Sequence, residues 1–146
     1  MIRLLTAGVL LALFTLPATA WPQERRWERQ VREQLDRTVN ALQGTSRGQT
    51  RVLNVGPLNI DESDLIVVEL NPGKAYDIVG VCDEDCTGLH ILLSTATRND
   101  VAVDRSSENL PVLHYAPTQA GSYRIKVTMA ACRVNPCWYG VAIRGS

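Results

Sequence analysis

The sequence predicts an all-β protein: an antiparallel β-sandwich of about eight strands, jelly-roll-like, preceded by one amphipathic α-helix. Three observations support this fold class. A helical stripe of apolar residues precedes Gly44, a series of short apolar segments follows it, and turn residues separate those segments without a further helical pattern. The chain accordingly divides into a signal peptide at 1–20, a helix at 21–44 and a sandwich domain at 45–146.

The first twenty residues have the pattern of a cleaved secretory signal peptide. Arg3 supplies the positive start, an apolar stretch covers 4–16, and Ala18-Thr19-Ala20 has the small residues of a cleavage site. The apolar stretch is shorter than the roughly 20 residues that a transmembrane helix needs. No cysteine follows Ala20 directly, as it would in a lipoprotein. We therefore expect a periplasmic or secreted protein without a membrane span.

Residues 22–43 have the spacing of a helix that is apolar along one side. Pro22 suits its first turn, and Gly44 suits the position just past its end. The stripe must be buried against the sandwich of the same chain, against a second copy, or against another exported protein. A membrane surface is a poorer choice, because the helix also carries acids that weaken attraction to anionic lipid. The candidate interaction surface is Trp27, Val31, Leu35, Val39 and Leu42.

Eight short segments rich in Val, Ile, Leu and Tyr follow a polar hinge at 44–49. The seventh alternates Tyr123, Ile125 and Val127 with polar residues, which is typical of a strand with one wet face. The candidate strands are 51–55, 65–70, 75–81, 89–94, 101–104, 112–115, 122–129 and 138–144.

The four cysteines all lie in the second half of the chain, and their even number predicts two disulfides in an oxidising compartment. Four cysteines allow three connectivities. Short spacings favour the local pairs Cys82–Cys86 and Cys132–Cys137, which would act as structural staples. Thiol exchange favours Cys-x-x-Cys at the start of a helix, and neither pair matches that spacing or context.

The turn inside the first pair is the best candidate metal site. It contains Asp83, Glu84 and Asp85, and Asp100 or Asp104 would add ligands if their loops converged on it. Calcium would be the expected ion, since it takes six to eight oxygen ligands. The alternative is a solvated turn held by the disulfide, because successive side chains on an extended backbone point apart. We expect no other cofactor.

Several function classes find no support in the residues. Fifteen basic residues balance fifteen acidic ones, which argues against a generally cationic nucleic-acid binder. The only histidines, His90 and His114, lie in predicted strands. The Gly-x-Ser-x-Gly pattern at 44–48 follows a predicted helix, whereas a nucleophile elbow lies between a strand and a helix. Trp138 and Tyr139 would suit a carbohydrate-binding patch, although their place in the last strand is also typical of a core.

Four short motifs follow one another in the second half of the chain. They are Asp61-Glu62-Ser63-Asp64 before an apolar strand, Asn71-Pro72-Gly73-Lys74-Ala75-Tyr76, the cysteine-bounded acidic turn, and Ala120-Gly121-Ser122-Tyr123 before a late strand. With these motifs, residues 56–145 resemble the bacterial pre-peptidase C-terminal domain, and the ending Cys137-Trp138-Tyr139-Gly140 resembles its cysteine-containing branch. The resemblance implies a secreted, non-catalytic β-sandwich that binds or assembles beside a partner.

The sequence thus predicts an exported, non-catalytic module for protein–protein interaction or assembly in the cell envelope. Its partner would be another exported protein or a second copy, held through the N-terminal helix. Two alternatives are a carbohydrate- or calcium-binding accessory module and a small secreted hydrolase.

Overall fold

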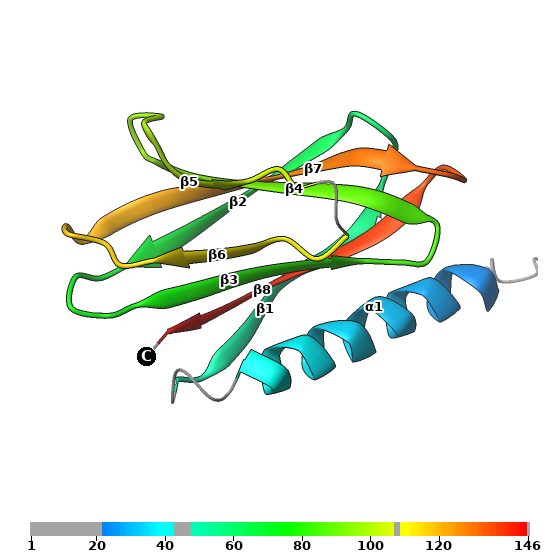
Figure 1. The fold of residues 1–146 in the computed structure, drawn as a ribbon, viewed down its shortest axis with the longest axis horizontal. Coiled ribbons are helices and arrows are strands. Elements are labelled where there is room, and N and C mark those ends of the chain that lie inside the picture. Colours follow the sequence, from blue (N-terminus) through cyan, green and yellow to red (C-terminus); the bar gives the residue numbers. More distant parts are fainter. Residues whose placement is uncertain (1–21, 43–47, 107–108, 146) are drawn as a thin grey trace, which may run out of the picture.

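A computed structural model describes residues 22–42, 48–106 and 109–145 of the chain (Figure 1). The predicted signal peptide, Trp21 and Gly44 lie outside the described residues. The elements are α1 (Pro22–Ala41), β1 (Thr50–Leu58), β2 (Ser63–Leu70), β3 (Tyr76–Cys82), β4 (Cys86–Thr95), β5 (Asp100–Asp104), β6 (Val112–Tyr115), β7 (Gly121–Cys132) and β8 (Cys137–Gly145).

The predicted helix and all eight predicted strands are present, with shifted ends. β1, β4 and β7 extend furthest beyond their predicted ranges, and β1 continues through Gly56 and Pro57 to Leu58. Glycine and proline usually end a strand, but β1 lies at the edge of its sheet and pairs only with β8. An edge strand tolerates proline, because the missing N–H group need not bond to a second neighbour.

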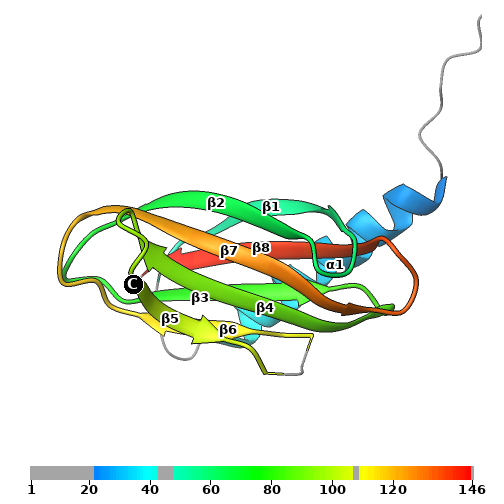
Figure 2. The ribbon, with the colours of Figure 1, turned by 90° about the horizontal axis from the view of Figure 1, so that it is seen from above.

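The strands form two antiparallel four-stranded sheets that pack face to face (Figures 1 and 2). One sheet has the order β1-β8-β3-β6, and the other has the order β2-β7-β4-β5. All the chain connections except β4–β5 cross from one sheet to the other, as in a jelly roll. The predicted fold class is therefore confirmed.

The main core lies between the two sheets. Inward-facing apolar residues of both sheets fill it, and they alternate with outward-facing residues along β7. β3 is buried along its whole length, which means that its outer face is covered as well. The largest fully buried side chains of this core are Leu70, Ile78, Leu89, Ile91, Leu93, Ile125, Met129 and Tyr139.

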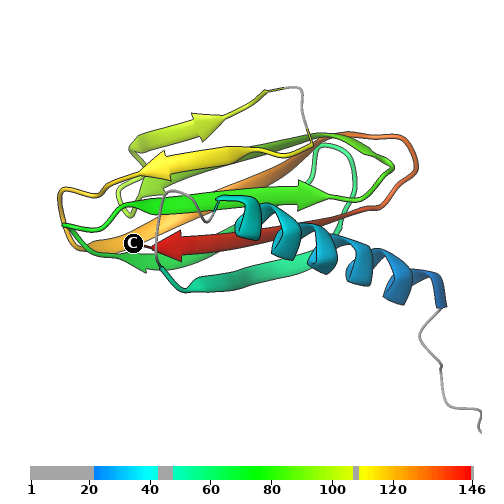
Figure 3. The same ribbon diagram turned by 60° about the horizontal axis from the view of Figure 1, so that its bottom comes forward.

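Helix α1 covers that outer face. It lies across β8 and β3 of the first sheet and also contacts β1 (Figure 3). Val31, Leu35 and Val39 are buried there against Val79, Val81 and Ala142 in a second apolar cluster, and Leu42 and Trp138 pack beside them.

The prediction that this stripe forms an interaction surface is therefore wrong for Val31, Leu35 and Val39, since no partner can reach them. The alternative, that the helix packs on its own sandwich, is confirmed. Trp27 and Leu42, at the two ends of the stripe, are half-buried.

The helix approaches the sheet closely at Gly140. A Cβ atom at this position would lie 2.7 Å from a methyl group of Leu35 and 2.7 Å from one of Val31. We predict that Gly140→Val lowers the free energy of unfolding by about 1–3 kcal/mol, because it overpacks the helix–sheet contact. Urea unfolding measures this loss. Gly56→Ala is the matched control, since nothing lies within 4 Å of its added Cβ; an equal loss in both variants would contradict the close contact.

Candidate functional site

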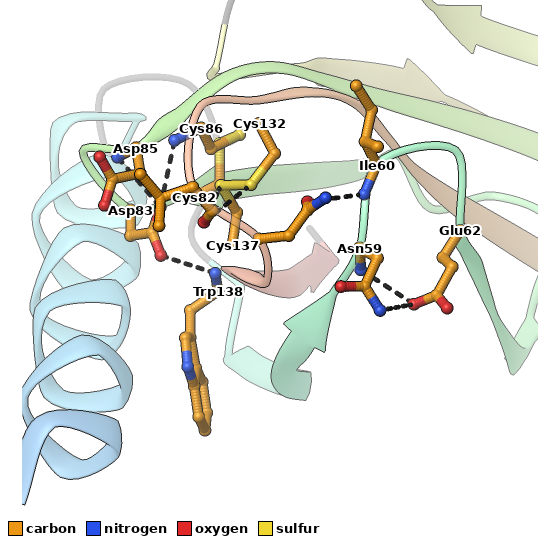
Figure 4. Close-up of a disulfide and its surroundings, with 12 residues drawn as sticks. Asn59, Ile60, Glu62, Cys82, Asp83, Asp85, Cys86, Cys132, Cys137 and Trp138 are labelled. Carbon is orange, nitrogen blue, oxygen red and sulfur yellow. Dashed lines mark hydrogen bonds between the residues drawn. A yellow bond between two sulfur atoms is a disulfide. The ribbon is translucent and has the colours of Figure 1, made fainter.

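Both disulfides lie at one end of the sandwich (Figure 4). Cys82 bonds to Cys86 and Cys132 bonds to Cys137, which are the local pairs that the spacing favoured. The first bridge spans the β3–β4 connection and the second spans the β7–β8 connection, and both connections cross between the sheets. The bridges are neighbours, because Cys86 pairs with Cys132 between β4 and β7. Each short loop contributes about 2 kcal/mol in the chain-entropy model.

The carboxylate of Asp83 is buried and accepts three backbone hydrogen bonds (Figure 4). Its Oδ1 accepts from the N–H groups of Asp85 (3.2 Å) and Cys86 (3.1 Å), and its Oδ2 accepts from that of Trp138 (2.6 Å). Burial raises the pKa of this carboxyl above its ordinary value of 3.8, although the three N–H groups act in the opposite direction. Asp83 thus holds the turn together and ties it to β8.

The three acids of this turn do not converge. Glu84 is exposed and lies 3.8 Å from Arg26 of the helix, while Asp83 points inward. Across the described parts of the chain, no three His, Cys, Asp or Glu side chains are grouped so that they could hold a metal ion.

Neither histidine is paired with a hydroxyl group of the residues that the structure describes. His114 is exposed on β6, and its Nδ1 lies 2.6 Å from Oδ1 of the buried Asp77 on β3. His90 is half-buried on β4. Within the described residues, no hydrogen bond joins either imidazole to a serine or threonine, as a Ser-His pair would require.

Trp138 and Tyr139 do not form a shared aromatic patch, so that interpretation is wrong. As neighbours on one strand they point to opposite faces of the sheet. Trp138 packs in the helix–sheet cluster, and Tyr139 is buried between the sheets.

The hydroxyl group of Tyr139 belongs instead to a polar network near the β1–β2 side of the sandwich. It donates to Oδ2 of Asp64 (2.5 Å), and the side-chain amide of Asn54 donates to the same carboxylate oxygen (2.6 Å). The bond from Tyr139 is the main reason why the pKa of Asp64 lies below its ordinary value.

We predict that Tyr139→Phe lowers the free energy of unfolding by about 1–2 kcal/mol at pH 7, since a hydrogen bond to a half-buried carboxylate is lost. A lowered folded-state pKa stabilises the fold above the ordinary value of 3.8, and this contribution is lost as the pH falls toward the folded-state value. The difference in the free energy of unfolding between wild type and Tyr139→Phe, measured by urea unfolding, should therefore become smaller as the pH falls from 7 to 3. The control is Tyr123→Phe, which loses a hydrogen bond to the neutral carbonyl of Gln119, so its difference in stability from the wild type should not depend on pH in this range. The same pH response in both variants would contradict the role of the bond between Tyr139 and Asp64.

The outer face of the β2-β7-β4-β5 sheet is not covered by α1, which packs on the other sheet. No described element packs over it, whereas α1 covers the other sheet (Figures 2 and 3). Leu65 and Val67 on β2 are 54% and 60% exposed, and Val103 on β5 is 53% exposed. Soluble monomeric proteins seldom leave neighbouring aliphatic side chains so exposed without a function.

Side chains on this face form rows across the strands. Lys126 on β7 pairs with Leu65 on one side and with Leu92 on the other, and Leu92 pairs with Val103. Directly paired residues point to the same face of a sheet, so one cation lies among three aliphatic side chains. We call this row, together with Val67, the outer-sheet patch.

The sequence did not single out the outer-sheet patch. Residues 65–70 are apolar on both faces, as in a fully buried strand, so their pattern does not show that one face stays open. The available signal was the wet face of the neighbouring β7, since two paired strands share their faces.

Within the described part of the chain, no helix combines the length and the apolar character that crossing a membrane requires. No model of a known protein family matches the chain, and no curated protein matches it either. The resemblance to the pre-peptidase C-terminal domain therefore stays a prediction.

Proposed function

We propose that this protein is an exported, non-catalytic module that binds another protein of the cell envelope through the outer-sheet patch. The observation that carries the proposal is the exposure of Leu65, Val67 and Val103 on a sheet face that no described element covers. Burying such side chains against a partner would contribute about 25 cal/mol per Å² of apolar area.

The proposed binding surface is the outer-sheet patch and not the apolar stripe of the helix. The apolar side of α1 is already used inside the domain, where it buries the other sheet. The sandwich therefore has one face closed by its own chain and one face open, and the open face is available to a partner. An exposed apolar patch bordered by polar residues is typical of a surface that binds another protein.

Export is supported by the two disulfides and by the signal-peptide pattern of residues 1–20. That the module is non-catalytic, and that it lies in the periplasm or outside the cell, are parts of the same proposal.

Site-specific photocross-linking tests the binding surface. A photoreactive residue at Val67 or Val103 should give the same defined adduct in intact cells, and Leu65→Ser should reduce its yield without changing the melting temperature by more than about 2 °C. The control position is Arg37, an exposed residue of α1. Adducts of equal yield from Arg37, or a yield that Leu65→Ser leaves unchanged, would contradict the proposed surface.

A further inference from the structure

A shallow hollow of about 310 Å³ lies at one end of the outer-sheet patch. Its size is at the lower end of the range for small-molecule sites. Strand β4 supplies an imidazole and an aliphatic floor, β7 supplies an ammonium group and a hydroxyl group, and the residue after β5 supplies a guanidinium group. The lining residues are His90, Ile91, Leu92, Arg105, Lys126 and Thr128.

None of the described acidic side chains lines this hollow, and its lining contains two cations, Arg105 and Lys126. The nearest acid in the strand order is Asp104, whose carboxylate is occupied by the N–H groups of Ser106 (2.9 Å) and Val112 (3.0 Å). Burial would raise the pKa of Asp104, but the hydrogen bonds from Ser106 and Val112, together with the nearby imidazole of His90, hold the pKa below its ordinary value. Farther along the same face, Glu69 accepts a hydrogen bond from Ser122. Neither Lys126 nor Arg105 forms an ion pair with a described acidic side chain, so their charge is available to a ligand.

We propose that the hollow binds the carboxylate of an acidic side chain on a protein partner, whose neighbouring aliphatic side chains lie on Leu65, Val67 and Val103. This inference rests on the proposed function and names the chemistry of the partner. A guanidinium and an ammonium group can share one carboxylate. The Thr128 hydroxyl beside them is hydrogen-bonded to Oγ of Ser63 (2.8 Å), so it donates to a ligand only where Ser63 is the donor of that bond. The apolar rows beside the hollow exclude water from the pair.

A second copy of this chain is a poorer occupant. The inner strands of this sheet are β7 and β4, and in a two-fold dimer through this face the residues nearest the axis meet their own counterparts. With the axis near β7, Lys126 and Arg124, which both face outward from that strand, would meet their counterparts, and like charges disfavour such an interface.

An acidic polysaccharide also fits the face less well than a protein does. Sugar rings are usually held by stacking on aromatic side chains. Of the described aromatic residues, Tyr76, Tyr115, Tyr123 and Tyr139 belong to the core between the sheets, and Trp138 packs under the helix. Trp27 lies on the helix itself. The face therefore presents aliphatic side chains and cations, which suit an acidic protein surface.

Amide chemical-shift titration with a model peptide tests the chemistry directly. The probe is acetyl-Leu-Glu-Leu-Glu-Leu-amide at low salt, and its Gln-for-Glu counterpart is the control. We expect the acidic peptide to shift the amides of His90, Arg105 and Lys126 with an affinity about three- to tenfold higher than that of the neutral peptide. The preference should disappear in Lys126→Gln/Arg105→Gln and persist in Lys74→Gln/Arg51→Gln, which removes two exposed cations elsewhere.

Equal binding of the two peptides, or a preference that survives Lys126→Gln/Arg105→Gln, would overturn the inference. Stronger shifts of the same amides with polygalacturonate or inorganic phosphate would also overturn it, because the ligand would then be a glycan or a free anion. The cross-link from Val67 distinguishes a failure of the carboxylate site from a failure of the proposed protein interface. A cross-link that is lost in Leu65→Ser but kept in Lys126→Gln/Arg105→Gln would retain the protein interface and refute the carboxylate site.

Discussion

Leu35→Ala is expected to lower the free energy of unfolding by about 3 kcal/mol, which is a large part of the stability of a domain of this size. Leu35 is 1% exposed and lies at the centre of the contact between α1 and β8. Truncation removes its transfer free energy and leaves a cavity over Gly140, which has no side chain to fill it. Urea unfolding followed by far-UV circular dichroism measures the loss.

Arg37→Ala is the control, since Arg37 lies on the exposed side of the same helix and its replacement should change stability by less than about 0.5 kcal/mol. If Leu35→Ala costs no more than this control, α1 does not pack on the sheet in solution. The apolar stripe would then be free after all, and the helix would return as the candidate interaction surface. The two variants therefore decide between the helix and the outer-sheet patch.

The sequence predicted the elements of the fold well, because each has a strong periodic pattern. The stripe of α1 repeats every three or four residues, and the strands are short, apolar and bounded by turns. An amphipathic stripe shows that a helix must bury one side, but it does not show what that side is buried against. The missing information lay in the last strand, where Gly140 and Ala142 face outward and leave room for a helix.

The acidic turn shows a second limit of sequence reasoning. Asp83, Glu84 and Asp85 are neighbours in the chain, and the local spacing alone does not reveal which of them points inward. The turn directs Asp83 toward the N–H groups of the turn and of β8, so that a residue considered as a metal ligand has a structural role. That role depends on β8, which is more than fifty residues away in the sequence, and only the assembled sandwich brings the two together.

Asp83→Ala is expected to lower the free energy of unfolding by about 2–4 kcal/mol. The variant leaves the N–H groups of Asp85, Cys86 and Trp138 without their acceptor, and each hydrogen bond to a charged group contributes about 1.5–3 kcal/mol. The expected loss of stability is smaller than the sum of three such contributions, because the wild type also bears the free-energy cost of burying the carboxylate. Asp83→Asn keeps one acceptor oxygen and should lose less, while Glu84→Ala, at an exposed neighbour, is the control.

The pH dependence of stability is a second test of the buried, structural role of Asp83. Because burial raises the pKa of Asp83, the folded protein binds a proton there more tightly than the unfolded chain does. This group therefore stabilises the fold increasingly as the pH falls from neutral through the folded-state pKa toward 3.8, and it contributes no further change below that value. The difference in the free energy of unfolding between wild type and Asp83→Ala should accordingly become larger as the pH falls over this range, whereas the difference for Tyr139→Phe should become smaller.

Calcium provides the outcome that would contradict the structural role of Asp83. A carboxylate that already accepts three N–H groups would have to give up these bonds to bind an ion, so calcium should leave the melting temperature of the wild type unchanged. A calcium-dependent rise in melting temperature that Asp83→Ala abolishes and Glu84→Ala reduces would assign the turn to a metal site. A loss of stability in Asp83→Ala that calcium does not alter would instead assign the carboxylate to the turn and to its connection with β8.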